Sequence, residues 1–411
     1  MSIAIIGGGA AGMFAACAAA EAGAEVTLFE RGKACGIKLN LTGKGRCNVT
    51  NNCELDALIQ NTPRNGKFLY SAFAVCPPGQ VMAFFEGLGV PLKTERGNRV
   101  FPVSDSAKDI TGALKTGMKR RGVRILQARI ARILTENGAV SGLETSDGAS
   151  FPASRVIVAT GGFSYPATGS DGDGYRLAEA LGHTVTPTRP SLVPLVGERV
   201  LCKSLEGLSL RNVGMEINCK GKVLYSDFGE MLFTAEGVSG PMVLSASAHL
   251  NEGQFPCRLT IDLKPALDME TLDRRILRDF SDNLNRDFSN SLGGLLPAKL
   301  VPVIAQRSGI PADLKVHSVT KVQREALCRL LKGFTLEMTG LGSYRDAVIT
   351  SGGVDVRGIN PKTMMSRMVE GLYFAGEVMD VDAYTGGFNL QIAWSTGHLA
   401  GVSAARAEEV L

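Results

Sequence analysis

The feature that most restricts the fold of this chain is a glycine-rich turn close to its N-terminus. Residues 7–12 read Gly-Gly-Gly-Ala-Ala-Gly, which fits the pattern G-x-G-x-x-G. An apolar run over residues 2–6 precedes the turn, and small helix-forming residues follow over 10–22. The first glycine permits the tight turn, the second lets a pyrophosphate approach the backbone, and the third lets the helix pack closely on the strand. The sequence therefore predicts a dinucleotide-binding βαβ opening.

An acidic residue stands where such a unit needs one. A second predicted strand, residues 25–29, is followed by Glu30, which lies 18 residues after Gly12. A carboxylate there accepts hydrogen bonds from ribose hydroxyls, and it disfavours the 2′-phosphate of NADP. A glycine-rich turn without a ligand is the alternative, which the strand, helix and acid together make less favourable. The expected cofactor contacts at this end are Gly7, Gly9, Ala10, Ala11, Gly12, Glu30 and Arg31.

A second glycine-rich element lies near the C-terminus. Residues 371–377 read as a strand that ends in an acid, and Tyr-Thr-Gly-Gly-Phe-Asn-Leu-Gln follows over 384–391, before an alanine-rich helix. The N-terminus of that helix would point its N–H groups at the flavin N1/O2 edge, where negative charge gathers on reduction. Two such elements at opposite ends of the chain suit FAD, although a packed strand–loop–helix is the alternative. The expected contacts are Gly376, Glu377, Gly386, Gly387, Phe388, Asn389, Leu390 and Gln391.

The remaining pattern predicts a discontinuous fold, because 411 residues are too many for one core. From about residue 191 apolar residues alternate, as in half-buried strands, and over 265–332 they recur at helical spacing from Met269 to Phe288. Near Val348 the strand-and-glycine style returns. We expect an α/β Rossmann-like FAD-binding domain, a β-barrel-like insert and a small helical insert. Their ranges are 1–190 with 343–411, 191–264 with 333–342, and 265–332.

Charge and cysteine usage limit the functional classes. The 44 basic and 40 acidic residues give a net charge of +4, too small to indicate a nucleic-acid partner. No run of 18 apolar residues indicates a membrane span. Nine cysteines without a C-x-x-C pair are expected to be reduced thiols of a cytoplasmic protein, which argues against a disulfide reductase. Four scattered histidines predict no metal site.

Four longer motifs place the chain beside a known family. They occupy residues 43–51, 159–166, 237–241 and 376–391. With them the chain resembles, over nearly its whole length, the bacterial NAD(P)/FAD-dependent oxidoreductases of the BaiN type. Lys44 stands where glycine is usual in that family, and Ile37 where a basic residue is usual. The resemblance implies non-covalent FAD, with cofactor contacts from Lys38, Thr42, Gly45, Arg46, Cys47, Asn48, Thr160, Gly161 and Gly162.

Candidate catalytic residues lie in the same motifs. Arg46 is expected to act electrostatically on flavin or substrate, and Tyr165 and Tyr384 are each able to donate a proton, with satisfied core tyrosines as the equal alternative. Cys47 has no partner histidine in reach, so a packed thiol is favoured over a redox role. In 169–174, Gly-Ser-Asp-Gly-Asp-Gly, one of the two aspartates is expected to cap a helix.

These observations predict a reductase in which FAD passes hydride to a polarised C=C bond of a small-molecule substrate. Members of the resembling family are linked to bile-acid enones, which makes a steroid-like substrate the analogy of choice. A flavin oxidase of small amines is the runner-up, and a non-catalytic flavin-binding or RNA-associated module is the alternative of another class. No second G-x-G-x-x-G is found, so NAD(P)H would have to dock transiently on the flavin. The sequence leaves the oligomeric state open.

Overall fold

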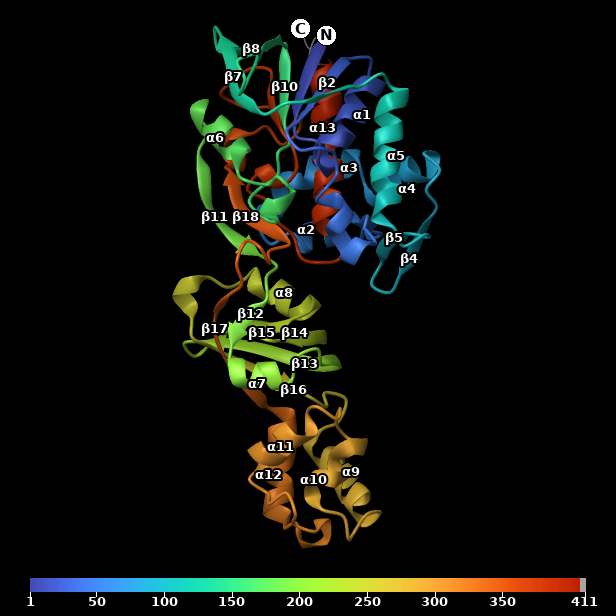
Figure 1. Ribbon diagram of the computed structural model, residues 1–411, viewed down its shortest axis with the longest axis vertical. Helices are drawn as coiled ribbons and strands as arrows, with labels where there is room; N and C mark the ends of the chain where they lie inside the picture. The colour runs from blue at the N-terminus through green and yellow to red at the C-terminus, as the bar shows by residue number, and fades with distance from the viewer. Residues whose placement is uncertain (407–411) are drawn as a thin grey trace. The chain divides into compact units, whose positions relative to one another are not determined.

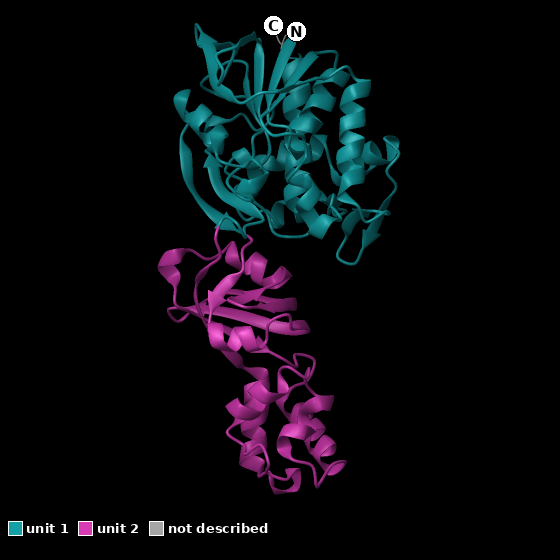
Figure 2. Cartoon of the chain, viewed as in Figure 1, with its two compact units in different colours: residues 1–191, 344–411 teal, residues 192–343 magenta. Residues whose placement is uncertain are grey.

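A computed structural model describes residues 1–406 of the chain (Figure 1). The chain divides into two compact units, which Figure 2 shows in different colours. The first unit consists of residues 1–191 and 344–411, and the second of residues 192–343. No single helix in the described part of the chain has the length and apolar character to cross a membrane, and one bent helix pair meets the test by length and composition only.

A parallel five-stranded sheet forms the centre of the first unit. Its strands lie in the order β19-β10-β1-β2-β6, and all four pairings are parallel. Most of its residues are apolar and buried, as expected of a parallel sheet with covered faces. The bounds are β1 Ser2–Ile6, β2 Glu25–Glu30, β6 Arg124–Gln127, β10 Arg155–Val158 and β19 Leu372–Phe374.

The first and last helices of the chain pack directly against each other (Figure 1). They are α1 (Ala10–Glu21) and α13 (Phe388–Arg406). A Cβ atom on Gly397 would lie 2.5 Å from the carbonyl oxygen of Ala11, and one on Gly401 would lie 2.5 Å from that of Ala15. Glycine at these two positions of α13 therefore lets the two backbones approach closely.

Smaller elements complete this unit. Asn137 and Gly138 form the hairpin turn between β7 and β8, and both have the positive φ that such a turn requires. The helices are α2 Leu55–Gln60, α3 Tyr70–Val75, α4 Pro78–Gly87, α5 Ala107–Arg120 and α6 Asp173–Ala180. The strands are β3 Thr50–Asn51, β4 Leu92–Glu95, β5 Arg99–Pro102, β7 Ile130–Glu136, β8 Ala139–Thr145, β9 Ser150–Pro152, β11 Val185–Ser191 and β18 Ile349–Val354.

The second unit contains a closed antiparallel barrel and a group of helices inserted between two of its strands. The barrel order is β12-β15-β14-β13-β16-β17. Its bounds are β12 Leu195–Gly197, β13 Ser209–Cys219, β14 Lys222–Thr234, β15 Gly237–Ser239, β16 Cys257–Asp262 and β17 Phe334–Leu341. The helices inserted between β16 and β17 are α9 Met269–Ser281, α10 Phe288–Ser291, α11 Val301–Ser308 and α12 Lys321–Lys332, and two further helices, α7 Arg199–Ser204 and α8 Pro241–Ser247, lie between other strands. The expected fold class, a Rossmann-like α/β domain with a barrel and helices inserted, is confirmed.

Two expectations about the second unit are wrong. Cys219 and Cys257 form a disulfide, because they face each other directly in the register of β13 and β16. The spacing of the cysteines could not predict this bond, because it depends on the pairing of two strands whose cysteines lie 38 positions apart. The helical spacing read from Met269 to Phe288 is also interrupted, since α9 ends at Ser281 and Leu284 is exposed.

Candidate cofactor and active site

The predicted glycine-rich turn has the backbone geometry of a phosphate-binding loop. Gly7 has a φ of +106°, and a Cβ atom on Gly12 would lie 1.9 Å from the carbonyl oxygen of Gly7. A Cβ atom on Gly9, in contrast, would meet no described atom within 4 Å. No side chain caps the first turn of α1 within the described chain. The N–H groups of that turn therefore face open space beside Gly9, which is the arrangement that binds a pyrophosphate.

Glu30 is held at the carboxyl end of β2 by two backbone donors. Its Oε2 accepts from the N–H of Gly8 at 2.8 Å, and its Oε1 accepts from the N–H of Gly32 at 2.6 Å. Each oxygen keeps a further lone pair, so the carboxylate is able to accept from ribose hydroxyls as well. Its position beside the glycine-rich turn supports the role expected from the sequence.

A polar cluster brings together residues from distant parts of the first unit. Lys38 Nζ donates to Ser164 Oγ and to Glu377 Oε2, both at 2.6 Å, and Ser164 Oγ donates to Glu377 Oε1 at 2.5 Å. The N–H of Thr350 also donates to Glu377 Oε1, at 2.9 Å. Lys38 and Glu377 were expected near the cofactor. Ser164 and Thr350 were not, although Ser164 lies inside the motif at 159–166.

The loop before α13 also has the backbone shape that its sequence predicts. Gly386 and Gly387 have φ values of +122° and +101°, and a Cβ atom on Gly387 would lie 2.4 Å from the carbonyl oxygen of Thr50. Asn51 Nδ2 donates to the carbonyl of Gly386 at 3.0 Å. This contact fixes the turn that opens α13, and it leaves the helix N-terminus beside the glycine pair.

Two polar side chains of α13 hold this loop from within. Asn389 exchanges hydrogen bonds with the N–H and carbonyl of Ala383, at 2.9 and 2.7 Å. The fully buried Gln391 accepts from Thr50 Oγ1 at 2.5 Å and donates to the carbonyl of Cys76 at 2.8 Å. The side-chain polar groups of Asn389 and Gln391 are thus hydrogen-bonded within the protein. Of the eight residues expected to contact the cofactor here, these two therefore shape the loop and do not offer side-chain donors to the cofactor.

The segment from Thr42 to Asn48 contains residues with different surroundings. Arg46 donates to Glu95 at 2.5 Å and to Asp105 at 2.6 Å, and its guanidinium stacks 4.1 Å from the ring of Phe101. Arg46, one of the three catalytic candidates, therefore already has its charge paired with two carboxylates.

The neighbouring Cys47 and Asn48 differ in what they offer. Burial raises the pKa of the Cys47 thiol to about 12, which keeps it protonated and supports the packed, unreactive role. Asn48 Oδ1 is buried and has no hydrogen-bond partner among the described residues. An orphaned buried acceptor of this kind fits a donor from a bound cofactor.

The two candidate tyrosines are half-buried. Tyr165 has a φ of +54°, and its N–H donates to the carbonyl of Tyr344 at 3.4 Å. The N–H of Tyr384 donates to the carbonyl of Asn61 at 3.0 Å. Both phenols remain proposals for the proton donor.

A buried carboxyl group in the same C-terminal loop escaped the sequence analysis. Asp382 is 2% exposed and accepts from Ser191 Oγ at 3.2 Å. Burial raises its pKa above the ordinary value for aspartate. Two residues earlier, Asp380 is paired with Arg64. The only sequence signal was the position of both acids in the motif at 376–391.

Comparison with known proteins agrees with this geometry. Residues 1–403 match the family described as "HI0933-like protein Rossmann domain". The chain is 34% identical to the 3-dehydro-bile acid delta(4,6)-reductase of Clostridium scindens, with 98% of each chain covered. It is 33% identical to the ribosomal RNA dihydrouridine synthase of Escherichia coli, with 95% of each covered. The 3-ketosteroid delta1-dehydrogenase of Sterolibacterium denitrificans shares the fold with a TM-score of 0.55 at 14% identity, covering 98% of this chain and 99% of that one.

Proposed function

The chain belongs to the HI0933-like Rossmann-domain family and is an FAD-dependent oxidoreductase, and from that premise we propose that it reduces C=C bonds conjugated to a carbonyl group. The two relatives named above support this reaction class. One is a reductase of delta(4,6) bonds in a 3-dehydro-bile acid, and the other forms dihydrouridine in ribosomal RNA. In a conjugated enone, and equally in uracil, the carbon β to the carbonyl is electrophilic and accepts hydride.

The observation that carries the proposal is the open N-terminus of α1 at Gly9, together with the glycine pair that precedes α13 and the Lys38–Ser164–Glu377 cluster in the same unit. FAD bound non-covalently along this path supplies hydride from N5 when it is reduced. With FAD bound, the N–H groups at the start of α13 would stabilise the negative charge that the flavin gains on reduction. Tyr165 or Tyr384 completes the reaction by giving a proton to the carbon α to the carbonyl.

The electron source in this proposal is a nicotinamide nucleotide that docks transiently on the flavin. The described part of the second unit is an antiparallel barrel with helices, not a second parallel nucleotide-binding module. A separate, lasting NAD(P)H site is therefore not part of the proposal.

The substrate we favour is a small enone of steroid-like size. Residues 192–343 contain 18 Lys and Arg against 17 Asp and Glu. An RNA-binding surface normally has an excess of positive charge. The balanced charge of the inserted unit supports a small apolar substrate over a polynucleotide, and it is the reason to test the two side by side.

An anaerobic two-step experiment tests the proposal. NADH or NADPH is added to the oxidised protein, and loss of flavin absorbance near 450 nm is expected. A 4,6-dien-3-one steroid or a uridine-containing RNA hairpin is then added to the reduced protein. Return of the absorbance with the steroid alone supports the proposed substrate, and return with RNA alone replaces it with a polynucleotide. The reductase hypothesis would be refuted in favour of an oxidase if the flavin absorbance returned with neither acceptor and a small amine bleached the oxidised protein.

A further inference from the structure

A largely irregular segment of the first unit, residues 161–173, begins three residues after β10 and includes the first residue of α6. We refer to it as the strap. It contains one short 3-10 turn, Pro166–Thr168. Four of its residues have positive φ: Gly161, Tyr165, Gly169 and Gly172. A path with so many left-handed positions is fixed by its sequence and by the contacts that hold it.

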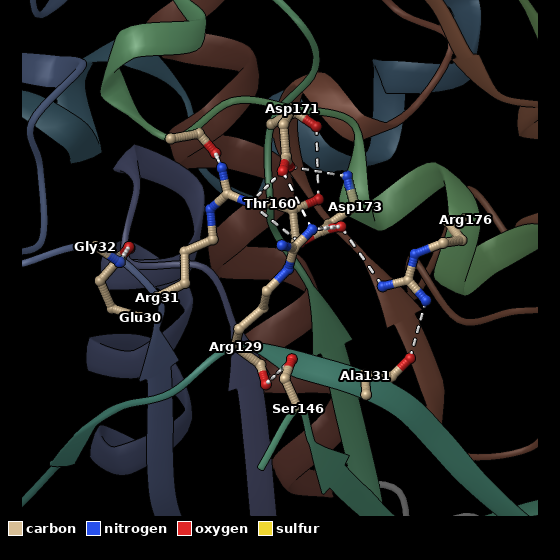
Figure 3. Close-up of polar contacts among 12 residues, drawn as sticks. Glu30, Arg31, Gly32, Arg129, Ala131, Ser146, Thr160, Asp171, Asp173 and Arg176 are labelled. Atoms are coloured by element: carbon tan, nitrogen blue, oxygen red, sulfur yellow. Dashed lines mark hydrogen bonds and ion pairs between the residues drawn. The ribbon is translucent and has the colours of Figure 1, made fainter.

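At the C-terminal end of the strap, charged side chains attach it to two arginines, one that follows β2 and one that follows β6 (Figure 3). Arg129 forms a two-pronged pair with Asp173, at 2.8 and 2.7 Å, and also reaches Asp171 at 3.3 Å. Arg31 is paired with Asp171, lies 3.2 Å from Asp173, and donates to the carbonyl of Gly169 at 2.5 Å. The N-cap position of α6 is Gly172 and not an aspartate, but Asp171 Oδ1 accepts from the N–H of Asp173, the first residue of the helix, at 3.2 Å.

The order of the strands shows what the strap crosses. The strap begins after β10, which lies on one side of β1, whereas Arg31 follows β2 and Arg129 follows β6 on the other side. Ion pairs between them carry the strap across the carboxyl end of β1. The glycine-rich turn leaves β1 at that end, and Glu30 stands beside it. The ADP half of a dinucleotide binds along this edge.

We propose that the strap is a gate over the adenosine half of the FAD site, held closed by the pairs of Arg31 and Arg129 with Asp171 and Asp173. The ion pairs break each time FAD enters or leaves. This inference rests on the binding of FAD by the first unit and is independent of the substrate. It assigns these four residues to cofactor retention, with no part in the chemistry.

The charges and exposure of the four residues that hold the strap suit ion pairs that are able to break. Burial alone would raise the pKa of Asp173, but the hydrogen bond from Arg129 and the charges of Arg129, Arg31 and Arg176 together hold it below its ordinary value. Asp173 is therefore a carboxylate at neutral pH. The Arg129 side chain is 50% exposed and that of Asp171 is 38% exposed. Salt screens such pairs, so the closed state is stable by a modest margin.

A gate has a kinetic signature that a direct FAD contact lacks. If the same ion pairs close the strap with and without FAD, weakening them speeds entry and exit by the same factor and leaves Kd nearly unchanged. Losing a direct contact would speed exit alone, and a purely structural residue would change neither rate. The two rates must therefore be measured together.

The experiment compares Arg129→Gln with Arg132→Gln in the full-length protein. Arg132 forms an exposed ion pair with Glu144 on β7 and β8, and it makes no contact with the strap aspartates in the described structure. FAD release is followed by the rise in free-flavin fluorescence on dilution, and FAD entry by its quenching in the deflavinated protein. For Arg129→Gln both rates are expected to rise about fivefold, as loss of a partly exposed ion-pair set implies. Raising NaCl from about 0.05 to 0.5 M should speed both rates in the unaltered protein, and less so in the variant.

Each other outcome overturns the gate. Unchanged rates in Arg129→Gln would show that the pairs do not limit exchange, and faster release with unchanged entry would make Arg129 an FAD contact. Asp171→Asn serves as a second variant if Arg129→Gln does not fold, and the salt dependence of the unaltered protein needs no variant. Absence of any bound FAD would contradict the cofactor assignment itself, and so is distinguishable from failure of the gate.

Discussion

Replacing Lys38 by Met tests whether the Lys38–Ser164–Glu377 cluster stabilises the first unit. The substitution keeps the apolar stem of the side chain and removes two charge-assisted hydrogen bonds of 2.6 Å. Glu377 is only 13% exposed, so it cannot regain full hydration. It does keep the bonds from Ser164 Oγ and the N–H of Thr350. Since a charged hydrogen bond contributes roughly 1.5–3 kcal/mol, and the site is partly hydrated, we expect a loss of about 2 kcal/mol in unfolding free energy.

The assay uses the single tryptophan of the chain. Trp394 is fully buried in the first unit, so its fluorescence reports the unfolding of that unit alone. Urea unfolding is measured on full-length protein without added FAD, so that ligand binding does not contribute. The double variant Lys38→Met/Glu377→Gln should lose less than the sum of the two single variants. An unchanged transition in Lys38→Met, or strict additivity in the double variant, would refute this account of the cluster.

Three further results are expected. Gly12→Ala should abolish FAD binding, because its Cβ would lie 1.9 Å from a backbone oxygen, whereas Gly112→Ala, which has open space, should retain the flavin absorbance. Cys219→Ser should lower the unfolding free energy of the second unit by about 4 kcal/mol, the chain-entropy value for a 38-residue loop, and leave the Trp394 transition in place; an unchanged circular-dichroism melt would contradict the disulfide. Burial raises the pKa of Cys76 from 9.0 to about 12, so the unfolded thiol loses its proton first. Stability is then constant below pH 9 and falls above it, by about 1.4 kcal/mol per pH unit for this thiol, and Cys76→Ala should show a shallower decline from pH 9 to 11.

Features set by local chemistry were predictable from the sequence. The turn at 7–12, the acid at Glu30 and the glycine pair at 386–387 each need particular residue types in adjacent positions, since positive φ and close backbone approach favour glycine. The alternation along β13 was equally readable, because its buried residues fall on one face. These elements define the fold class and the proposed path of the cofactor.

Features set by contacts between distant segments were not predictable from the sequence. Ser164 and Thr350 join Glu377 only once β10, β18 and the C-terminal loop are assembled. The pairing of Arg129 with Asp173 depends on the strand order, which no local pattern states. Arg46 looked available for catalysis because its partners Glu95 and Asp105 lie 49 and 59 residues away along the chain.

The packing of α1 on α13 has a consequence for the order in which the chain is made. Gly397 and Gly401 receive the backbone of α1, so α1 gains its packing partner only when residues 388–406 have been synthesised. Strand β19 likewise joins the parallel sheet late. The second unit, in contrast, is one uninterrupted stretch, 192–343. On the ribosome it is able to fold before α13 has been made, whereas the first unit cannot complete its core until then.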